Sequence, residues 1–238
     1  MDEPPVSERP GEIRGELRPY GRRAFLGLTV AGLSSLVWAK PVWRAVSGAA
    51  RPFQDALPAG IVPSSGWRIY TVASTMPRFD PKTWRLSVEG MVEQPLSLSY
   101  DDLLALPRAE QVSDFHCVTG WSVDGVHWAG VRFGDLLAEA RPKPGAGALE
   151  FVSSEVPYTD SLTLRQAMLG DVLLATHMDG KPLPRAHGAP ARVVMPRMYG
   201  YKNVKWVEKV VVVAGAEPGY WEQRGYDTDA WVGRSNGY

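Results

Sequence analysis

The sequence predicts an α+β fold in which short strands and short helices are joined by many loops. The chain of 238 residues contains 24 Gly and 20 Pro, a loop-rich composition that argues against a helical bundle. Hydrophobic residues make up 45% of the chain and charged residues 22%, as in ordinary globular proteins. Strand-like and helical runs follow one another without the regular strand–helix–strand spacing of an α/β protein. The class is therefore α+β.

In the first half of the chain, alternating apolar and polar residues predict a half-buried strand at residues 84–89. A second short strand, at residues 96–99, follows across a turn. Ser99 is then placed to cap a short helix that ends at Pro107. Residues 110–116 are predicted to be extended.

In the second half, apolar residues at helical spacing predict a helix over residues 133–140, and a shorter one is expected at residues 164–168. Asp179 and Gly180 have the composition of a hairpin turn. Four further β-rich runs lie at residues 149–153, 172–178, 191–195 and 206–213. The last run is almost continuous in valine, which predicts a strand buried on both faces.

Charge and cysteine content exclude several kinds of function. The 26 Lys and Arg balance the 26 Asp and Glu, so no global basic charge points to nucleic acid as a partner. Cys117 is the only cysteine, which excludes an intramolecular disulfide and any zinc or iron–sulfur site built from several cysteines. A functional thiol in this chain therefore acts singly.

Residues 1–51 are predicted to be a twin-arginine-type signal or anchor segment, and residues 52–238 one domain. The pair Arg22–Arg23 precedes an uncharged stretch at residues 24–39, which is shorter than the ~20 residues that cross a bilayer comfortably. The arginine pair resembles the twin-arginine motif, a receptor-read address. We expect export to the periplasm or another extracytoplasmic site; an uncleaved membrane-anchoring helix is the alternative.

The first candidate for chemistry is Cys117, at the end of the predicted extended segment. A lone cysteine is most often a small buried hydrophobic residue. A junction between strand and loop, however, presents side chains to pockets. The following Gly120, Trp121 and Ser122 offer close backbone approach, a flat wall and a hydroxyl group.

The second candidate is a basic segment at residues 181–209. Against Glu208 it carries seven basic residues: Lys181, Arg185, Arg192, Arg197, Lys202, Lys205 and Lys209. Several Gly and Pro residues shape it into loops, which suits capture of a compact anion such as phosphate better than a solvated helix face would. Of the four histidines, His187 lies inside this segment and is the one expected to serve as a cofactor donor.

Several sequence blocks together resemble the molybdopterin-binding domain of the sulfite oxidase family. In chain order they are residues 117–122 (CVTGWS), 128–131 (WAGV), 180–184 (GKPLP), 187–192 (HGAPAR) and 196–205 (PRMYGYKNVK). The resemblance spans the chain from about Trp67 onward. It is greatest to the exported bacterial branch that includes the catalytic subunit of protein-methionine-sulfoxide reductase. It implies the mixed, β-rich fold of that family.

The resemblance implies a molybdenum-molybdopterin (Mo-pyranopterin) cofactor whose one protein ligand to the metal is the Cys117 thiolate. Soft thiolate suits such a metal, and ligation requires the deprotonated form. Matching positions imply that the pterin and its phosphate are held by Ser153, His187, Arg192, Asn203, Val204 and Lys205. Thr71 and Thr75 are the candidates for a further binding block near residues 70–76. Trp121 and Tyr199 are expected in the catalytic pocket wall, with packing in an aromatic core as the alternative.

The substrate inference rests on departures from the relatives. Sulfite oxidases carry basic residues just after the cysteine, where this chain has Gly120, Trp121 and Ser122. The methionine-sulfoxide reductase branch often has Glu at the position of Thr119, and often Asn at that of His187.

The resemblance thus implies two-electron oxygen-atom transfer that reduces an S-oxide or N-oxide, either small or protein-bound. No c-type haem motif fits one cysteine, so electrons would come from a separate redox partner such as a membrane haem protein. Three alternatives stay open. The first is sulfite dehydrogenase-like oxidation, and the second is a non-catalytic molybdopterin-binding module. The third is a hydrolase whose Cys117 nucleophile is activated by His187.

Overall fold

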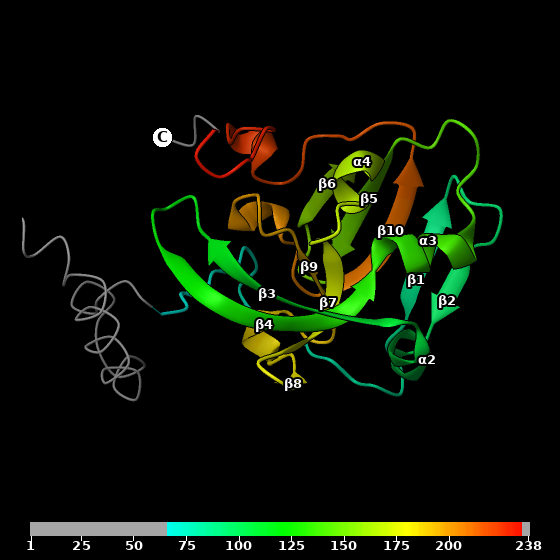
Figure 1. Cartoon of the computed structure of the whole chain (residues 1–238), viewed down its shortest axis with the longest axis horizontal. Coiled ribbons are helices and arrows are strands. Elements are labelled where there is room, and N and C mark those ends of the chain that lie inside the picture. The colour runs from blue at the N-terminus through cyan, green and yellow to red at the C-terminus, as the bar shows by residue number, and fades with distance from the viewer. Residues whose placement is uncertain (1–65, 235–238) are drawn as a thin grey trace, which may run out of the picture. The chain divides into compact units, whose positions relative to one another are not determined.

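Two five-stranded sheets and several short helices make up residues 66–234, the part of the chain that the computed structural model describes (Figure 1). This arrangement confirms the predicted α+β class. The predicted export segment at residues 1–51 lies outside the described residues. Within residues 66–234, no helix is both long and apolar enough to cross a membrane.

The first sheet is centred on β10 (Val207–Val213). In spatial order its strands are β2 (Leu96–Leu98), β1 (Leu86–Gly90), β10, β5 (Ala148–Ser153) and β6 (Thr159–Thr163). β10 pairs in parallel with β1 and antiparallel with β5, which joins the two ends of the domain sequence in one sheet. β6 is the edge strand beside β5.

The second sheet is built around a long hairpin of β3 (Arg108–His116) and β4 (Ser122–Arg132). β7 (Leu173–Met178) pairs with the far side of β4, and both β8 (Lys181–Pro182) and β9 (Arg192–Val194) pair with β7. The hairpin carries Cys117 at its tip, beyond the last pair of the ladder, His116 with Ser122.

Short helices connect the strands. The α-helices are α2 (Tyr100–Ala105), α3 (Phe133–Ala140) and α4 (Leu164–Ala167), and the 3-10 helices are η2 (Arg185–His187), η3 (Gly200–Lys202) and η4 (Glu222–Arg224). α3 buries one face, which includes Phe133 and Leu136, as its helical spacing of apolar residues predicts.

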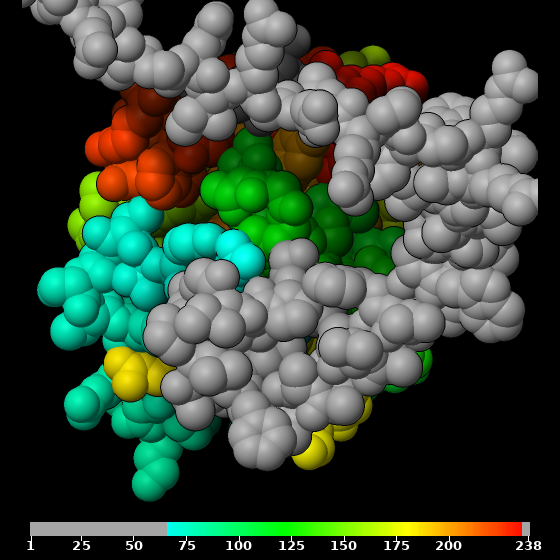
Figure 2. Space-filling model, turned by 90° about the vertical axis from the view of Figure 1, so that its left-hand side faces the viewer, coloured from blue at the N-terminus to red at the C-terminus, as the bar shows by residue number. Residues whose placement is uncertain are grey.

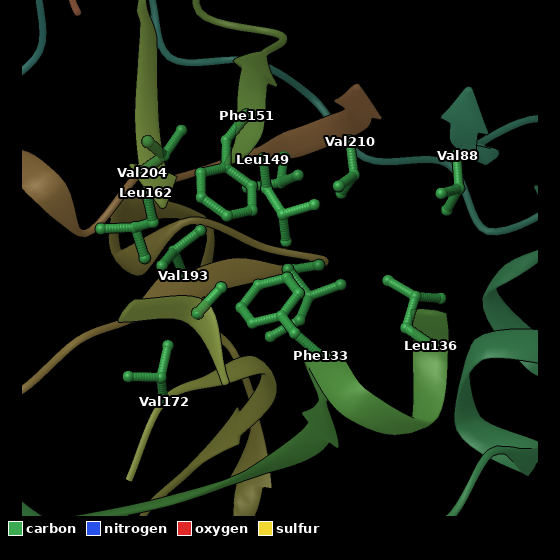
Figure 3. Close-up of a cluster of buried hydrophobic side chains, with 14 of the residues drawn as sticks. Val88, Phe133, Leu136, Leu149, Phe151, Leu162, Val172, Val193, Val204 and Val210 are labelled. Atoms are coloured by element: carbon green, nitrogen blue, oxygen red, sulfur yellow. The ribbon is translucent and has the colours of Figure 1, made fainter. Parts of the chain in front are cut away.

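The main core lies between α3 and the inner faces of the two sheets. Figure 3 shows Phe133 and Leu136 of α3 facing Leu149 and Phe151 of β5, with Val210 of β10 beside them. The rings of Phe133 and Phe151 lie 5.2 Å apart. Their burial stabilises the fold by roughly 1.5–3 kcal/mol for each large side chain, so the sheets that bear the site have a fixed support.

Most of the predicted elements are present with boundaries shifted by one or two residues. α3 has the predicted bounds, and Asp179 and Gly180 form the predicted hairpin turn, both with positive φ. Three strands were not predicted, among them the two-residue β8. β4 contains Gly125 and Gly130, which interrupt its alternation, and β6 is short and polar.

The prediction that residues 206–213 are buried on both faces is wrong. In β10, Val207, Val210 and Val212 are buried, but Glu208 is exposed and Val211 is only half-buried. A register shift between Val207 and Lys209 in the pairing with β5 turns part of the strand outward. The run of valines therefore lines one buried face of the sheet.

Ser99 caps α2 as predicted, and its removal gives a small, measurable loss of stability. The Ser99 Oγ accepts a hydrogen bond from the Asp102 amide at 3.1 Å, and the Asp102 carboxylate accepts one from the Ser99 amide at 2.9 Å. We expect Ser99→Ala to lower the free energy of unfolding by about 1 kcal/mol in urea titrations. Ser97→Ala, on exposed β2, is the control and should stay within about 0.5 kcal/mol of wild type. Equal losses in both variants would contradict the capping role.

Candidate functional site

One cavity, of about 330 Å³, gathers residues that lie far apart in the sequence. Figure 2 looks onto the face where the segment after residue 66 (cyan), the β3–β4 hairpin (green) and the C-terminal segment (orange-red) lie next to one another. The walls of the cavity come from residues 68–72, the loop of the β3–β4 hairpin, Glu155, Tyr158, η2, β9, residues 200–205, Trp221 and Tyr226. Such a convergence of loops at the ends of strands is typical of a ligand site.

Cys117 is presented to this cavity by a tightly closed loop. The Cys117 amide donates to the Trp121 carbonyl at 2.8 Å, and the Gly120 amide donates to the Cys117 carbonyl at 3.0 Å. Gly120 has a φ of +88°, which residues with a side chain rarely adopt. At the base of the loop, His116 Nδ1 lies 2.9 Å from the Ser122 hydroxyl. The thiol therefore has a fixed position, and it is only half-buried.

The side chains that follow Cys117 in the hairpin loop are neutral. The Thr119 hydroxyl lies 3.2 Å from Cys117 Sγ, within hydrogen-bond distance of sulfur. The Trp121 ring is almost fully buried and packs against Phe115, with ring centroids 5.6 Å apart. Trp67 packs against Phe115 in turn, at 4.9 Å. An aromatic wall therefore stands beside the thiol.

Arg192 is a buried cation whose described hydrogen bonds are made to backbone carbonyls. Its guanidinium donates to the carbonyls of His187 (3.1 Å), Asn203 (3.4 Å) and Val193 (3.4 Å). Burial lowers the pKa of Arg192 to about 10, which still leaves it protonated at neutral pH. A guanidinium has five N–H donors, so these bonds leave two of them unused in a residue that lines the cavity.

Lys205 and His187 complete the polar side of the cavity. Burial, with Arg192 nearby, lowers the pKa of Lys205 to about 8, and its ammonium donates to the Tyr70 carbonyl at 2.6 Å. Burial also lowers the pKa of His187 to about 4, helped by the positive charges of Arg192 and Lys205. The imidazole is therefore neutral at neutral pH. Its Nδ1 is buried without a hydrogen-bond partner among the described residues.

The predicted site residues divide into two groups. Seven of them line the cavity: Thr71, Cys117, Trp121, His187, Arg192, Asn203 and Lys205. The other four, Thr75, Ser153, Tyr199 and Val204, do not. Ser153 Oγ donates to the Lys205 carbonyl at 2.7 Å, and Val204 is fully buried. These two residues support the loop that carries Lys205.

Asn203 lines the cavity, but its side chain is engaged within the fold. Its Oδ1 accepts from the Met195 amide at 2.7 Å, and its Nδ2 donates to the Met195 and Tyr199 carbonyls at 3.3 and 3.4 Å. What Asn203 can offer to a ligand is therefore mainly its backbone. Thr71 is similar, because its hydroxyl donates to the Ala73 carbonyl at 2.6 Å.

Sequence reasoning missed several wall residues. Glu155 is buried and accepts hydrogen bonds from the Val72 and Ala73 amides at 2.8 and 3.3 Å, which holds the segment at residues 70–73 in the wall. Tyr158, Trp221 and Tyr226 add aromatic surface. No local pattern marks these residues, since they meet only through the packing of β6 and the C-terminal segment.

The chemistry of the cavity fits a molybdopterin cofactor. Arg192 is buried and Lys205 half-buried, and neither forms an ion pair with a carboxylate in the described part of the chain, so an anion such as a phosphate would relieve the cost of their desolvation. The unpartnered His187 Nδ1 suits a polar ring system. Cys117 offers a thiol in the same cavity. The two cations can bind the phosphate of such a cofactor, the imidazole nitrogen can hydrogen-bond its ring system, and the thiol can bind its metal.

Comparison with known proteins gives a consistent result. Residues 73–221 match the family described as the oxidoreductase molybdopterin binding domain. The chain is 39% identical over 155 residues to YuiH of Bacillus subtilis (strain 168), an uncharacterised oxidoreductase, covering 64% of this chain and 77% of YuiH. It is 33% identical over 156 residues to MsrP of Ralstonia nicotianae, the catalytic subunit of a protein-methionine-sulfoxide reductase, covering 59% of this chain and 47% of MsrP.

A solved structure supports the same fold. The sulfane dehydrogenase SoxCD from Paracoccus pantotrophus is similar with a TM-score of 0.55 and 28% sequence identity, covering 60% of this chain and 41% of that one. The matched region is less than half the length of both MsrP and SoxCD.

Proposed function

Since the chain belongs to the oxidoreductase molybdopterin binding domain family, we propose that it reduces S-oxide or N-oxide substrates by two-electron oxygen-atom transfer. Family membership makes it a molybdenum-dependent oxidoreductase with a molybdenum-molybdopterin cofactor. The direction of reaction, the substrate class and the electron donor are our inference. In the balanced half-reaction, an S-oxide takes up two electrons and two protons and gives a thioether and water.

The neutrality of the groups around Cys117 is the observation that carries the choice of substrate. Val118, Thr119 and Trp121 follow the thiol, and none of them carries a charge. Of the three Arg and Lys residues that line the cavity, Arg192 and Lys205 donate to backbone carbonyls and are assigned to the cofactor, and Arg68 is exposed to solvent. An uncharged oxide with apolar substituents suits an aromatic, neutral wall better than an anion such as sulfite does.

Six residues of the cavity have an assigned role in this mechanism. When bound, the cofactor supplies the two-electron redox chemistry. Cys117 would be the protein ligand of the metal, and Arg192 and Lys205 would hold the cofactor's phosphate with charge-assisted hydrogen bonds. His187, neutral at neutral pH, would hydrogen-bond the pterin through Nδ1. Trp121 and Phe115 shape the pocket and exclude water from the substrate.

The remaining features of the proposal concern cellular context. Electrons come from a separate redox partner, for which a membrane haem protein is our candidate. The chain reaches a periplasmic or other extracytoplasmic site through a twin-arginine-type segment at residues 1–51, ahead of the catalytic domain at residues 52–238. MsrP, a relative at 33% identity, is named as the catalytic subunit of a reductase, which supports a division of labour between subunits.

Full-length protein produced in a molybdenum-replete host tests this function. We expect about one molybdenum per chain and a pterin fluorophore after denaturation. With a reduced viologen as donor, sulfoxides and N-oxides should be turned over, and sulfite with ferricyanide should react at least ~10-fold more slowly in kcat/KM. Faster sulfite oxidation would establish the dehydrogenase alternative. A metal-loaded protein without any turnover would establish a non-catalytic module.

A further inference from the structure

Next to the cavity residues Tyr158, Tyr201 and Trp221 lies a buried cluster of three charged side chains. The Lys202 ammonium lies 2.5 Å from a carboxylate oxygen of Asp160 and 2.5 Å from one of Glu222. The three side chains are 5%, 1% and 2% exposed, respectively. They come from η3, β6 and η4, which are separate elements.

The cluster joins three segments that build the cavity wall. Lys202 follows the wall residue Tyr201, Asp160 lies two residues after the wall residue Tyr158, and Glu222 follows the wall residue Trp221. The match to the family ends at residue 221. Glu222 is therefore supplied by a part of the chain beyond the matched domain.

The C-terminal segment at residues 219–226 is docked closely at this point. The Tyr220 amide donates to the Thr159 carbonyl at 2.8 Å, and the Gly219 amide donates to the second carboxylate oxygen of Glu222 at 2.7 Å. A Cβ atom at Gly219 would lie only 2.7 Å from Asp160 Cγ, so only glycine permits this approach. Figure 1 shows the segment, in red, running past the end of β6.

The aromatic groups on the segment extend this docking to the cavity. The Tyr220 ring stacks on Tyr158 at 5.5 Å, and Tyr226 packs against Tyr201 at 5.3 Å and against Trp221 at 5.1 Å. The Tyr201 hydroxyl donates to the Asp227 carbonyl at 2.6 Å. A movement of the segment would therefore move the wall.

The charges of the cluster do not balance. One ammonium faces two carboxylates in a buried place, and Asp160 Oδ2 has no hydrogen-bond partner among the described residues. A proton on that atom would make the cluster neutral. Burial raises the pKa of Asp160 to about 7, the Lys202 ammonium opposes this, and the Glu222 carboxylate adds to it.

The other titratable groups that face Asp160 do not exchange protons in this range. They are the phenols of Tyr158 and Tyr201, and burial raises the pKa of both above the ordinary value of 10. Arg192 of β9 interacts with Tyr158 and stays protonated at neutral pH. We therefore assign the proton to Asp160, whose Oδ2 is buried without a hydrogen-bond partner among the described residues.

We propose that Lys202, Asp160 and Glu222 are positioning residues that seat residues 219–226 as one wall of the substrate cavity, and that a proton on Asp160 tightens this seating. The role in substrate binding rests on the proposed function; the seating itself does not. Because the docked state binds the proton more tightly than the undocked state, docking weakens as pH rises toward 7 and levels off above it.

Hydrogen–deuterium exchange on the full chain between pH 5 and pH 8 tests this proposal. After correction for the intrinsic exchange rate, protection of residues 219–226 should fall by up to about tenfold per pH unit up to pH 7 and then level off, as expected for one proton. Asp160→Asn and Glu222→Gln each remove one negative charge and keep the shape of the side chain. In Asp160→Asn the protection should become independent of pH, and in Glu222→Gln, which keeps Asp160 buried but removes the neighbouring carboxylate, its dependence on pH should be weaker than in wild type.

Glu217→Gln is the matched control, because it makes the same change of charge at an exposed position two residues before this segment. It should retain the pH dependence of wild type. Constant protection in wild type, or an unchanged pH dependence in Asp160→Asn, would overturn the proposal. If Asp160→Asn does not fold, Glu222→Gln decides the matter, because an unchanged pH dependence in that variant would also contradict the proposal.

Steady-state kinetics distinguishes the seating of residues 219–226 from its effect on substrate binding. Because docking weakens with rising pH only in the wild type, the wild-type KM for a sulfoxide should rise from pH 5 to pH 7 relative to the KM of Asp160→Asn. The ratio of the two kcat values should stay constant. A parallel fall of kcat without a change in the KM ratio would refute the wall as a substrate-binding element. Failure of all oxides as substrates would refute the proposed function, whereas the exchange result would still decide the seating.

Discussion

Replacing Cys117 with serine should lower the turnover of oxide substrates by more than ~100-fold, because loss of single groups that only orient metal ligands already costs ~10–100-fold in affinity or activity. A serine hydroxyl is a harder and more weakly acidic donor than a thiol, so it is a poor ligand for molybdenum. Steady-state turnover with a reduced viologen, together with the absorption bands of the thiolate–metal bond, would measure the loss. The fold should be unaffected, since the thiol is only half-buried.

Thr119→Val serves as the control for this substitution. It removes the hydroxyl that lies 3.2 Å from Cys117 Sγ and leaves the thiol in place. We expect retained metal and a shifted reduction potential, because hydrogen bonds to a ligating sulfur tune the metal that it holds. Full turnover in Cys117→Ser would end the assignment of the thiol as the metal ligand.

Arg192→Met should lower both the cofactor content and the stability of the protein. The guanidinium holds the carbonyls of His187, Asn203 and Val193, and its removal leaves them without that donor inside the fold. We expect a loss of about 2 kcal/mol or more in the free energy of unfolding of the cofactor-free protein. The molybdenum content per chain should fall at least ~10-fold, since the proposed contact with the cofactor's phosphate is lost as well.

Arg185→Met is the matched control for that change. Arg185 lies in the same basic segment and also donates to backbone carbonyls, those of Met76 and Pro77, but it is exposed and does not line the cavity. Its loss should cost within about 0.5 kcal/mol and leave the molybdenum content unchanged. Equal effects of the two substitutions would show that Arg192 has no special role at the cofactor site.

The sequence predicted the fold class and most of the elements because those signals are local. Helical spacing gave α3, and an N-cap residue gave the start of α2. β4 was missed because Gly125 and Gly130 break its pattern. At Gly130 the backbone of β7 lies so close that a Cβ atom would overlap Leu174. That requirement comes from strand pairing, which a single segment does not display.

The site was predictable where function demands particular residue types. A lone cysteine at a strand end and a basic segment of loops already indicated a thiol and an anion site, and the structure brings Cys117, Arg192 and Lys205 to one cavity. The buried charges of Asp160 and Glu222 were not foreseen. Their carboxylates read as ordinary surface charges until packing places them around Lys202.

The closed loop that carries Cys117 has an evolutionary consequence. Its two ends are fixed by the backbone bond between Cys117 and Trp121 and by the pair His116–Ser122, and none of these bonds uses the side chains of Val118 or Thr119. Mutations at those two positions can therefore accumulate without displacing Cys117, the proposed metal ligand. Substitutions at Val118 and Thr119 could therefore change substrate preference during evolution while Cys117 keeps its position.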